Sequence, residues 1–312
     1  MAPDELVSVI VPTYFRNEHV QDAIESAIGQ SYDPVEIIVV DDSGERHAEA
    51  VVTDYDVSYI PHDTNEGVEE ARNTGVDAAS GEYIQFLDDD DVLFEDKLER
   101  QVNLLESNPD VRVAYGGIEN RRGKILPDPE PGIPALHRAL GLSWPTTITS
   151  SLLISRDVLE DVLPLEAGTG DDIGLKIELA KRTNFDYVDD VLVKLGDSPD
   201  GRGASMDFAR EMNILIEKYD HLYRQLPEEV HRSALSKAYE CYGYALLSER
   251  TWSLEAIISL AKAQYYSSNT DPKRIGGLVA SIFGQPGREV AAKWYNAYRR
   301  SKGTTYERPQ SK

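Results

Sequence analysis

Four consecutive aspartates, Asp88 to Asp91, follow directly on the apolar run 83–87, so a buried strand is expected to lead straight into a cluster of carboxylates. Carboxylates this close repel one another, and a fold tolerates them where they are solvated or share a hard cation such as Mg²⁺ or Mn²⁺. The cluster therefore predicts a site for a metal-bound diphosphate. The plain alternative is a solvated acidic turn in an acidic protein.

The segments before the aspartates alternate between strand and helix patterns. Nearly continuous apolar runs at 6–11 and 35–40 predict central parallel strands covered on both faces, and residues 20–28 between them have helical apolar spacing. A short strand at 57–60 and a helix over 68–79 continue the alternation. This order predicts an α/β fold, a Rossmann-like, mostly parallel open sheet with helices on both faces.

Three polar segments each follow one of these expected strands, at residues 12–14, 41–42 and 88–90. In open α/β sheets, ligands bind in the crevice at the carboxyl ends of the strands. Three strand ends would therefore converge on one crevice. This convergence favours a functional aspartate cluster over an acidic turn.

Five segments resemble, in order and spacing, the motif blocks of family 2 glycosyltransferases: VSVIVPTYFRNE, EIIVVDDS, NEGVEEARNTG, GEYIQFLDDDD and GDDIGLKIELA. The resemblance covers about residues 5 to 195, and its specificity lies in the order of the blocks. It implies the GT-A fold and an inverting, metal-dependent enzyme that uses a nucleotide-diphosphate sugar. A cell-surface glycan or a glycoprotein oligosaccharide is the expected product, and a glycan or a lipid-linked glycan the expected acceptor.

The resemblance also implies a nucleotide-sugar site, with three residues against the base and two facing the nucleotide sugar: Pro12, Tyr14 and Asp42, and Arg72 and Asn73. An aspartate can accept an N–H from a base edge, an aromatic ring offers a stacking face, and an arginine fork suits a diphosphate. Plain alternatives stay open: a packed surface aromatic for Tyr14, a turn residue for Asp42, and a surface ion pair with Glu69 for Arg72.

The metal motif of the family is D-x-D after a strand, and the run of aspartates satisfies it. The resemblance implies that Asp90 is the direct ligand of Mn²⁺ or Mg²⁺, while Asp88 and Asp89 hold ribose or ordered water. Which of these two contacts the ribose stays open. Asp91 is expected to cap a helix that starts near Leu93.

A catalytic base is implied by the block at 170–180, which resembles the family's acidic pair at the start of a helix. Its second acid, Asp172, would deprotonate the acceptor hydroxyl on the face opposite the departing diphosphate. Helix capping and the macrodipole are the plain explanation of two acids at this place. Asp171 replaces the usual Glu, and Glu178 stands where an arginine is common, so the acceptor side departs from the family pattern.

Two segments lie between the aspartates and this block. The proline-dense segment 125–134 is expected to be a loop, since proline disrupts helices and central strands. Residues 146–154, rich in Thr, Ser, Ile and Leu, are expected to form a strand.

The alternation ends near residue 205, which predicts two domains: 1–205, catalytic and nucleotide-sugar-binding, and 206–312, helical. Segment 273–302 differs from the rest, because it carries seven basic residues and one acid. With its apolar and aromatic residues it is typical of an element that lies on anionic lipid. A basic helix docked on the acidic body is the alternative.

The composition limits the function classes further. A net charge of −23 argues against nucleic-acid binding. The sequence shows no stretch of 18 or more apolar residues and no cleavable leader, so a cytoplasmic protein is expected. Peripheral contact with the inner face of the membrane is compatible with this. The 12 Lys and 20 Arg beside 55 acids are typical of proteins that work in concentrated salt. We therefore expect a halophilic archaeal source; unfolding that did not depend on KCl would contradict this.

Two other functions are weighed against the transferase. A nucleotidyltransferase acting on sugar phosphates would carry a glycine-rich loop and a basic signature after its first strand, where this chain has residues 12–16, PTYFR. A nucleotide-sugar-binding or scaffold protein without turnover is suggested by Glu178 and by the absence of a histidine from segment 191–198.

Overall fold

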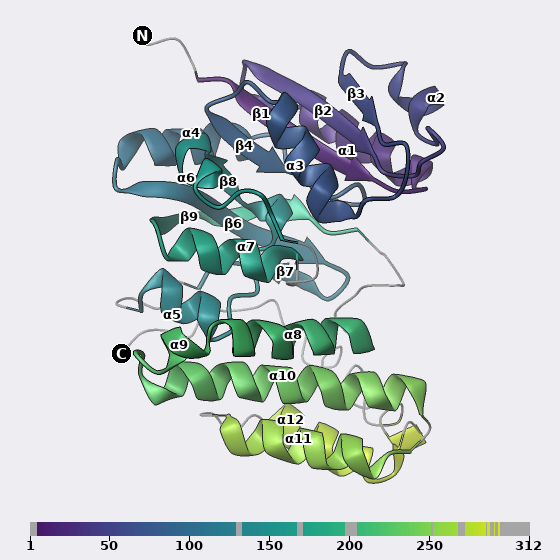
Figure 1. The fold of residues 1–312 in the computed structure, drawn as a ribbon, viewed down its shortest axis with the longest axis vertical. Coiled ribbons are helices and arrows are strands. Elements are labelled where there is room, and N and C mark those ends of the chain that lie inside the picture. Colours follow the sequence, from purple (N-terminus) through teal and green to yellow (C-terminus); the bar gives the residue numbers. More distant parts are fainter. Residues whose placement is uncertain are drawn as a thin grey trace. The chain divides into compact units, whose positions relative to one another are not determined.

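The structure, a computed structural model, describes residues 5–128, 133–166, 171–196, 205–250, 252–267, 272–284, 286–287, 290 and 293. Contacts divide the chain into two compact units. The first comprises residues 1–139 and 144–199, and the second comprises residues 140–143 and 200–312 (Figure 1).

The first unit is built on one mixed sheet with the strand order β3-β2-β1-β4-β8-β6-β9-β5, and β7 pairs with β6 (Figure 1). Its strands are β1 Val7–Thr13, β2 Val35–Asp41, β3 Ser58–Pro61, β4 Tyr83–Phe86, β5 Val92–Leu93, β6 Val111–Asn120, β7 Gly123–Ile125, β8 Leu153–Ser155 and β9 Asn184–Lys194. Strands β3, β2, β1 and β4 run parallel, and β8 is antiparallel to both of its neighbours. The predicted α/β fold is confirmed, with a sheet that is parallel in its first half and mixed overall.

Helices cover both faces of the parallel half, because successive side chains of a strand point to opposite faces. Every residue of β1 is buried. Val7, Val9 and Val11 belong to the core cluster that includes the apolar face of α1 (Asn17–Ile28). Ile10, on the other face, meets Gly75 of α3 (Val68–Ala78), where a Cβ atom would come within 2.3 Å of the isoleucine. Glycine is therefore what lets α3 approach the strand.

The strand register brings the expected site residues to one edge of the sheet. Thr13 pairs with Asp41 at the ends of β1 and β2, and Ile10 pairs with Phe86 at the end of β4. The backbone N–H of Asp42 donates to the carbonyl of Thr13 at 2.9 Å. Residues 12–14, 41–42 and 88–90 thus leave the same end of three parallel strands.

The strand predicted for 146–154 is wrong over most of its length. Residues Thr149–Ser151 form a 3₁₀ turn, η1, and only Leu153–Ser155 belongs to a strand, β8. The hydroxyl of Thr147 donates to the carbonyl of Trp144, and that of Ser151 donates to the carbonyl of Thr146. Such local hydrogen bonds from side chains to the backbone compete with the backbone hydrogen bonds of a sheet, which explains why most of this segment is not a strand.

The expected cap role of Asp91 is also wrong. The two-residue strand β5 (Val92–Leu93) follows this aspartate, and helix α4 begins only at Lys97.

Further helices lie among the described residues; the sequence predicted the one that begins near residue 171 and those after residue 205, but not those at 49–52 and 135–140. The further helices are α2 Glu49–Val52, α4 Lys97–Ser107, α5 Ala135–Leu140, α6 Arg156–Glu160 and α7 Asp171–Ala180, then α8 Met206–Lys218, α9 Asp220–Tyr223, α10 Glu228–Glu249, α11 Leu254–Tyr266 and α12 Pro272–Ser281. The part after residue 205 consists of helices joined by short connections in the residues that the structure describes, and the predicted helical C-terminal region is confirmed. None of the helices formed by described residues has the length and apolarity to cross a membrane.

Candidate active site

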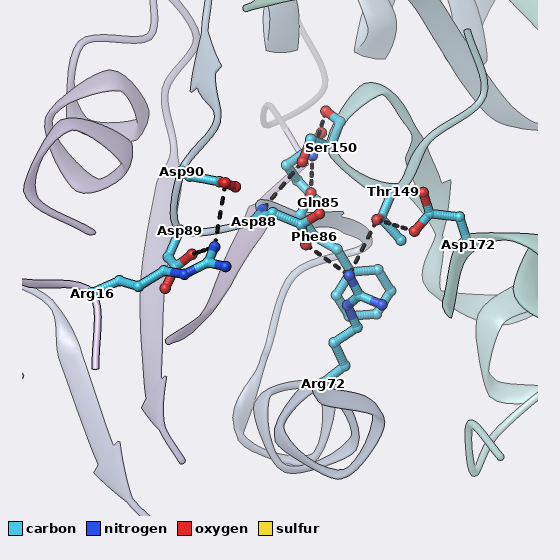
Figure 2. A network of polar contacts seen from close by, with 10 residues as sticks. All are labelled: Arg16, Arg72, Gln85, Phe86, Asp88, Asp89, Asp90, Thr149, Ser150 and Asp172. Atoms are coloured by element: carbon cyan, nitrogen blue, oxygen red, sulfur yellow. Dashed lines mark hydrogen bonds and ion pairs between the residues drawn. The ribbon is translucent and has the colours of Figure 1, made fainter. Parts of the chain in front are cut away.

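Asp89 and Asp90 face one cationic group (Figure 2). The Nη1 atom of Arg16 lies 3.1 Å from Oδ1 of Asp89 and 3.3 Å from Oδ2 of Asp90. The other oxygen of Asp89 accepts a hydrogen bond from the hydroxyl of Thr13 at 2.9 Å. Burial raises the pKa of Asp89 to about 6, although the charge of Arg16 opposes this. The two carboxylates therefore converge on one point, which a single positive charge already occupies.

Asp91 contacts the backbone just after the end of β9. Its Oδ1 accepts the backbone N–H of Gly196 at 2.9 Å. A Cβ atom on Gly196 would lie 2.2 Å from the carbonyl oxygen of Asp90, so the backbone can pass here only as glycine. Burial and the charge of Asp88 raise the pKa of Asp91 to about 8. This aspartate supports the structure of the run.

Asp88 begins a chain of contacts that ends at Asp172 (Figure 2). Nη2 of Arg72 lies 2.7 Å from Oδ1 of Asp88 and donates to the hydroxyl of Thr149 at 3.2 Å. That hydroxyl in turn donates to Oδ1 of Asp172 at 2.6 Å. The Thr149 hydroxyl accepts one hydrogen bond and donates its single hydrogen, so it connects the arginine to the carboxylate. Residues from four separate segments are thereby joined.

Arg72 is 2% exposed, which excludes the alternative of a surface ion pair. It lies on α3, and its guanidinium also sits 5.7 Å from the ring centroid of Phe86. Aromatic contact and the salt bridge to Asp88 hold the planar group in one orientation.

Asp172 is half-buried in the first turn of α7, as the sequence predicts for its place in the chain. Burial and the charge of Asp88 raise its pKa, while Arg72, the Thr149 hydroxyl and Lys176 oppose the rise. Lys176 lies one turn further along the helix, and burial lowers its pKa to about 8. A carboxylate with a raised pKa is a stronger proton acceptor than a free aspartate.

A buried polar network holds η1 at the end of β4. Lys97 is fully buried and donates to the amide oxygens of Gln85 and Gln101. These amides donate in turn to the carbonyls of Ser150, at 3.0 Å, and Ser151, at 2.9 Å. Burial lowers the pKa of Lys97 well below its ordinary value. The network fixes the turn that carries Thr149.

Asp42 holds the turn that precedes α3. Its two oxygens accept the backbone N–H groups of Glu66, at 2.8 Å, and Gly67, at 2.9 Å. Nδ1 of His62 also lies 2.8 Å from its Oδ1, and the carboxylate is almost fully buried. The loop with a φ of 95° at Gly67 is thus tied to the end of β2. With three partners, one acceptor position of the carboxylate is left for a ligand.

The loop after β1 presents an aromatic face beside these residues. Pro12 is buried and pairs with Val40 in the sheet, whereas the ring of Tyr14 is half-exposed. Phe15, with a φ of 54°, contacts Tyr14 edge to face and fixes the turn of the chain before Arg16. Tyr14 can therefore offer a ring face to a planar base.

Asn73 bonds to the protein's own backbone. Its Oδ1 accepts the N–H of Leu165 at 2.9 Å, and its Nδ2 donates to the carbonyl of Leu165 at 3.4 Å and to Glu70 at 3.0 Å. The amide thereby ties α3 to the segment that leads towards α7.

The carboxylate oxygens of the site suit a hard cation that also keeps phosphate and water ligands. Oxygens of Asp89 and Asp90 both contact one cationic nitrogen, at 3.1 and 3.3 Å, so the two carboxylates face the same point. Within the described residues, no group of three or more His, Cys, Asp or Glu side chains forms a complete metal-binding cluster. Mg²⁺ in nucleotide sites typically takes one or two carboxylates together with phosphate oxygens.

The sequence did not predict the roles of Arg16 and Lys176, nor the contacts of the Thr149 hydroxyl with Arg72 and Asp172. Arg16 follows the recognised loop directly, and its charge next to a predicted anion site was an available signal. Gln85 inside an apolar run, with Lys97 and Gln101 one helical turn apart, also indicates a buried polar network. No local signal marks Thr149.

Known proteins resemble this chain in sequence and in fold. The model of the family described as Glycosyl transferase family 2 matches residues 8–163. An uncharacterized glycosyltransferase of Rickettsia felis is 30% identical over 204 residues, which are 62% of this chain and 33% of that protein. The Escherichia coli UDP-Glc:alpha-D-GlcNAc-diphosphoundecaprenol beta-1,3-glucosyltransferase WfgD is 36% identical over 119 residues, 37% of this chain and 47% of that protein. The chain thus matches less than half the length of these relatives.

Two solved structures share the fold. Staphylococcus aureus TarS 1–349 in complex with UDP-GlcNAc has a TM-score of 0.61 at 19% identity, covering 96% of this chain and 93% of that one. The mannosyltransferase PcManGT from Pyrobaculum calidifontis, in complex with GDP-Man and Mn²⁺, has a TM-score of 0.58 at 20% identity, covering 92% and 83%. This chain therefore has a GT-A-like mixed sheet followed by a helical C-terminal region.

Proposed function

Because the chain belongs to glycosyl transferase family 2, we propose that it transfers a sugar, with inversion and with the help of a divalent metal, from a nucleotide-diphosphate donor to a hydroxyl acceptor. The observation that carries the proposal is the series of side-chain contacts Asp88–Arg72–Thr149–Asp172, which joins the proposed diphosphate-binding group to the proposed proton acceptor.

On the donor side, Pro12, Tyr14 and Asp42 hold the base, and Asn73, Asp88 and Asp89 line the nucleotide sugar. Asp90 holds the metal, with Asp89 beside it. When bound, a Mn²⁺ or Mg²⁺ ion neutralises charge that develops on the departing diphosphate. Arg72 donates N–H groups to the same diphosphate, for which a guanidinium is well shaped.

On the acceptor side, Asp172 takes the proton of the attacking hydroxyl. The acceptor oxygen forms a bond to the anomeric carbon, and the bond from that carbon to the diphosphate oxygen breaks. The electron pair leaves with the nucleotide diphosphate. The proton stays on the Asp172 carboxylate, whose raised pKa favours this step.

The donor and the acceptor are proposed from the relatives. UDP-GlcNAc and GDP-Man are bound by the two structural neighbours, and the E. coli relative is named for a lipid-linked acceptor. A thermal-shift panel of UDP-, GDP- and dTDP-sugars, with and without Mn²⁺, tests the donor class. If no sugar nucleotide shifts the melting temperature, the proposal is wrong.

Turnover distinguishes the transferase from its two rivals. Slow donor hydrolysis or sugar transfer in Mn²⁺ would exclude a binding or scaffold protein without activity. Release of pyrophosphate from a nucleoside triphosphate and a sugar phosphate would instead support a nucleotidyltransferase.

We also propose a cytoplasmic protein that touches the inner face of the membrane through segment 273–302. Most of the basic and aromatic residues of this segment lie outside the described residues. In the described part, four apolar side chains are exposed at helical spacing: Ile275, Val279, Ile282 and Phe283. They form one apolar face on and just after α12.

Replacing Val279 and Phe283 together by Asn should weaken binding to anionic liposomes by about tenfold or more, because two apolar side chains lose their burial in lipid. Flotation with vesicles of phosphatidylglycerol measures this. Ile214→Asn, on the exposed face of α8, makes the same kind of change and should leave flotation unaltered. Equal flotation of the double variant and the unchanged protein would contradict membrane contact through this face.

A further inference from the structure

Arg16 stands where the proposed metal would be held. A single nitrogen, Nη1, touches carboxylate oxygens of both Asp89 and Asp90, at 3.1 and 3.3 Å (Figure 2). On the basis of the proposed function, we propose that Arg16 is a built-in counter-cation: the divalent ion displaces it from the two carboxylates, and the displaced guanidinium then binds the diphosphate of the donor.

The contacts of Arg16 fit a group that is anchored at one end and exchangeable at the other. Its backbone carbonyl accepts the N–H groups of His19 and Val20, at 3.0 Å each, and so starts α1. Its side chain is 42% exposed, whereas the side chains of Asp89 and Asp90 are 8% and 17% exposed, so the ion pairs are open to solvent on the side of the arginine. Arg72, in contrast, is buried against Phe86 and Asp88. The guanidinium of Arg16 can therefore leave the carboxylates by side-chain rotation alone.

The exchange has a thermodynamic consequence. While Arg16 neutralises Asp89 and Asp90, a metal ion that arrives alone must first break both contacts, which lowers its affinity. A diphosphate offers the displaced guanidinium a new anionic partner with room for two parallel hydrogen bonds. Donor and metal should therefore strengthen each other's binding, and such coupling is reciprocal.

The test measures Mn²⁺ binding directly by electron paramagnetic resonance of the free ion, with and without UDP or GDP. We expect Arg16→Gln to bind Mn²⁺ alone several-fold more tightly than the unchanged protein. We also expect the factor by which the nucleotide tightens Mn²⁺ binding to fall by about fivefold or more in this variant.

Arg112→Gln is the matched control. Arg112 pairs with Asp157 at 3.2 Å and is 40% exposed, close to the 42% of Arg16, but it lies at the start of β6. The Arg112→Gln substitution removes the same charge from the surface as Arg16→Gln. Tighter Mn²⁺ binding in both variants would therefore be a general charge effect and would overturn the inference.

The outcomes separate the inference from the proposed function. If the unchanged protein binds Mn²⁺ with UDP or GDP and Arg16→Gln shows the same affinity and coupling, the inference is wrong and the proposed function stands. If neither protein binds Mn²⁺ under any of these conditions, the proposed metal site is wrong and the inference falls with it.

Discussion

Asp172→Asn should lower the rate of sugar transfer by about 10²- to 10⁴-fold, the usual contribution of a general base, while donor affinity stays unchanged. An amide cannot take the acceptor's proton, but it keeps the size of the side chain and an oxygen for the Thr149 hydroxyl. Initial rates with the donor found by the thermal-shift panel, together with donor titration, give the two quantities.

The plain explanation of Asp172, an acid that stabilises the start of a helix, has its own control. Asp157 is the second residue of α6, as Asp172 is of α7, and it lies outside the site. Asp157→Asn should leave the rate within about twofold, because it removes only a helix-start interaction and the exposed ion pair with Arg112, each worth at most about 1 kcal/mol of stability. Similar rates for Asp172→Asn and Asp157→Asn would refute the catalytic role.

The pH dependence extends the same prediction to Thr149. Only the ionised carboxylate of Asp172 accepts a proton, so the rate should fall as the pH drops through its raised pKa. The Thr149 hydroxyl donates to the ionised form and lowers that pKa. Thr149→Val should therefore move the acidic limb of the pH–rate profile to higher pH, and it should reduce the rate by about 10- to 100-fold on that limb, where less of the carboxylate is ionised.

Thr147→Val is the matched change for Thr149→Val, because the hydroxyl of Thr147 is also buried but donates to the carbonyl of Trp144. It should alter stability without shifting the pH profile. Thr149→Ser keeps the hydroxyl and should restore the profile. A shift that Ser does not reverse would show that Thr149 supports only the fold.

Asp90→Asn should abolish the metal-dependent part of the reaction, a loss on the order of 10³-fold, because the metal contributes several kcal/mol of charge stabilisation at the leaving diphosphate. The unchanged protein treated with EDTA should lose activity to the same extent and regain it with Mn²⁺. Rates and Mn²⁺ titrations on both proteins measure the effect.

Asp91→Asn provides the comparison within the same run of aspartates. Burial and the charge of Asp88 raise the pKa of Asp91 to about 8, so the neutral amide changes the charge here less than it would at an exposed aspartate. The amide oxygen can still accept the N–H of Gly196. Metal affinity should therefore stay near normal, and equal losses in the two variants would argue against Asp90 as the specific ligand.

The sheet could be predicted because strands that are buried on both faces consist mostly of apolar residues. β1 is buried on both faces and reads as an apolar run, and α1 and α3 follow with helical spacing. The ends of β1, β2 and β4 then follow from topology alone. Errors occurred where short polar side chains bond locally, as at residues 146–154, and where a two-residue strand separates an aspartate from the next helix.

The contacts within the site could not be predicted, since they join residues that are distant in the chain. Arg16 and Asp89 are 73 residues apart, and Arg72 and Thr149 are 77 residues apart. Their meeting depends on the register of the strands and on the path of η1, which the buried network of Lys97 fixes. Motif order indicated which residues serve the site, and only tertiary packing shows how they are joined.

The balance of charges around the aspartate run affects how fast an anion reaches this protein by diffusion. Asp88, Asp89 and Asp90 contact the guanidinium groups of Arg16 and Arg72, and the raised pKa of Asp91 reduces the charge of the fourth carboxyl, inside a chain of net charge −23. The entrance repels an incoming anion far less than the total charge suggests. Encounter rates with such ligands should accordingly follow the local field at the strand ends, with salt screening the rest of the surface.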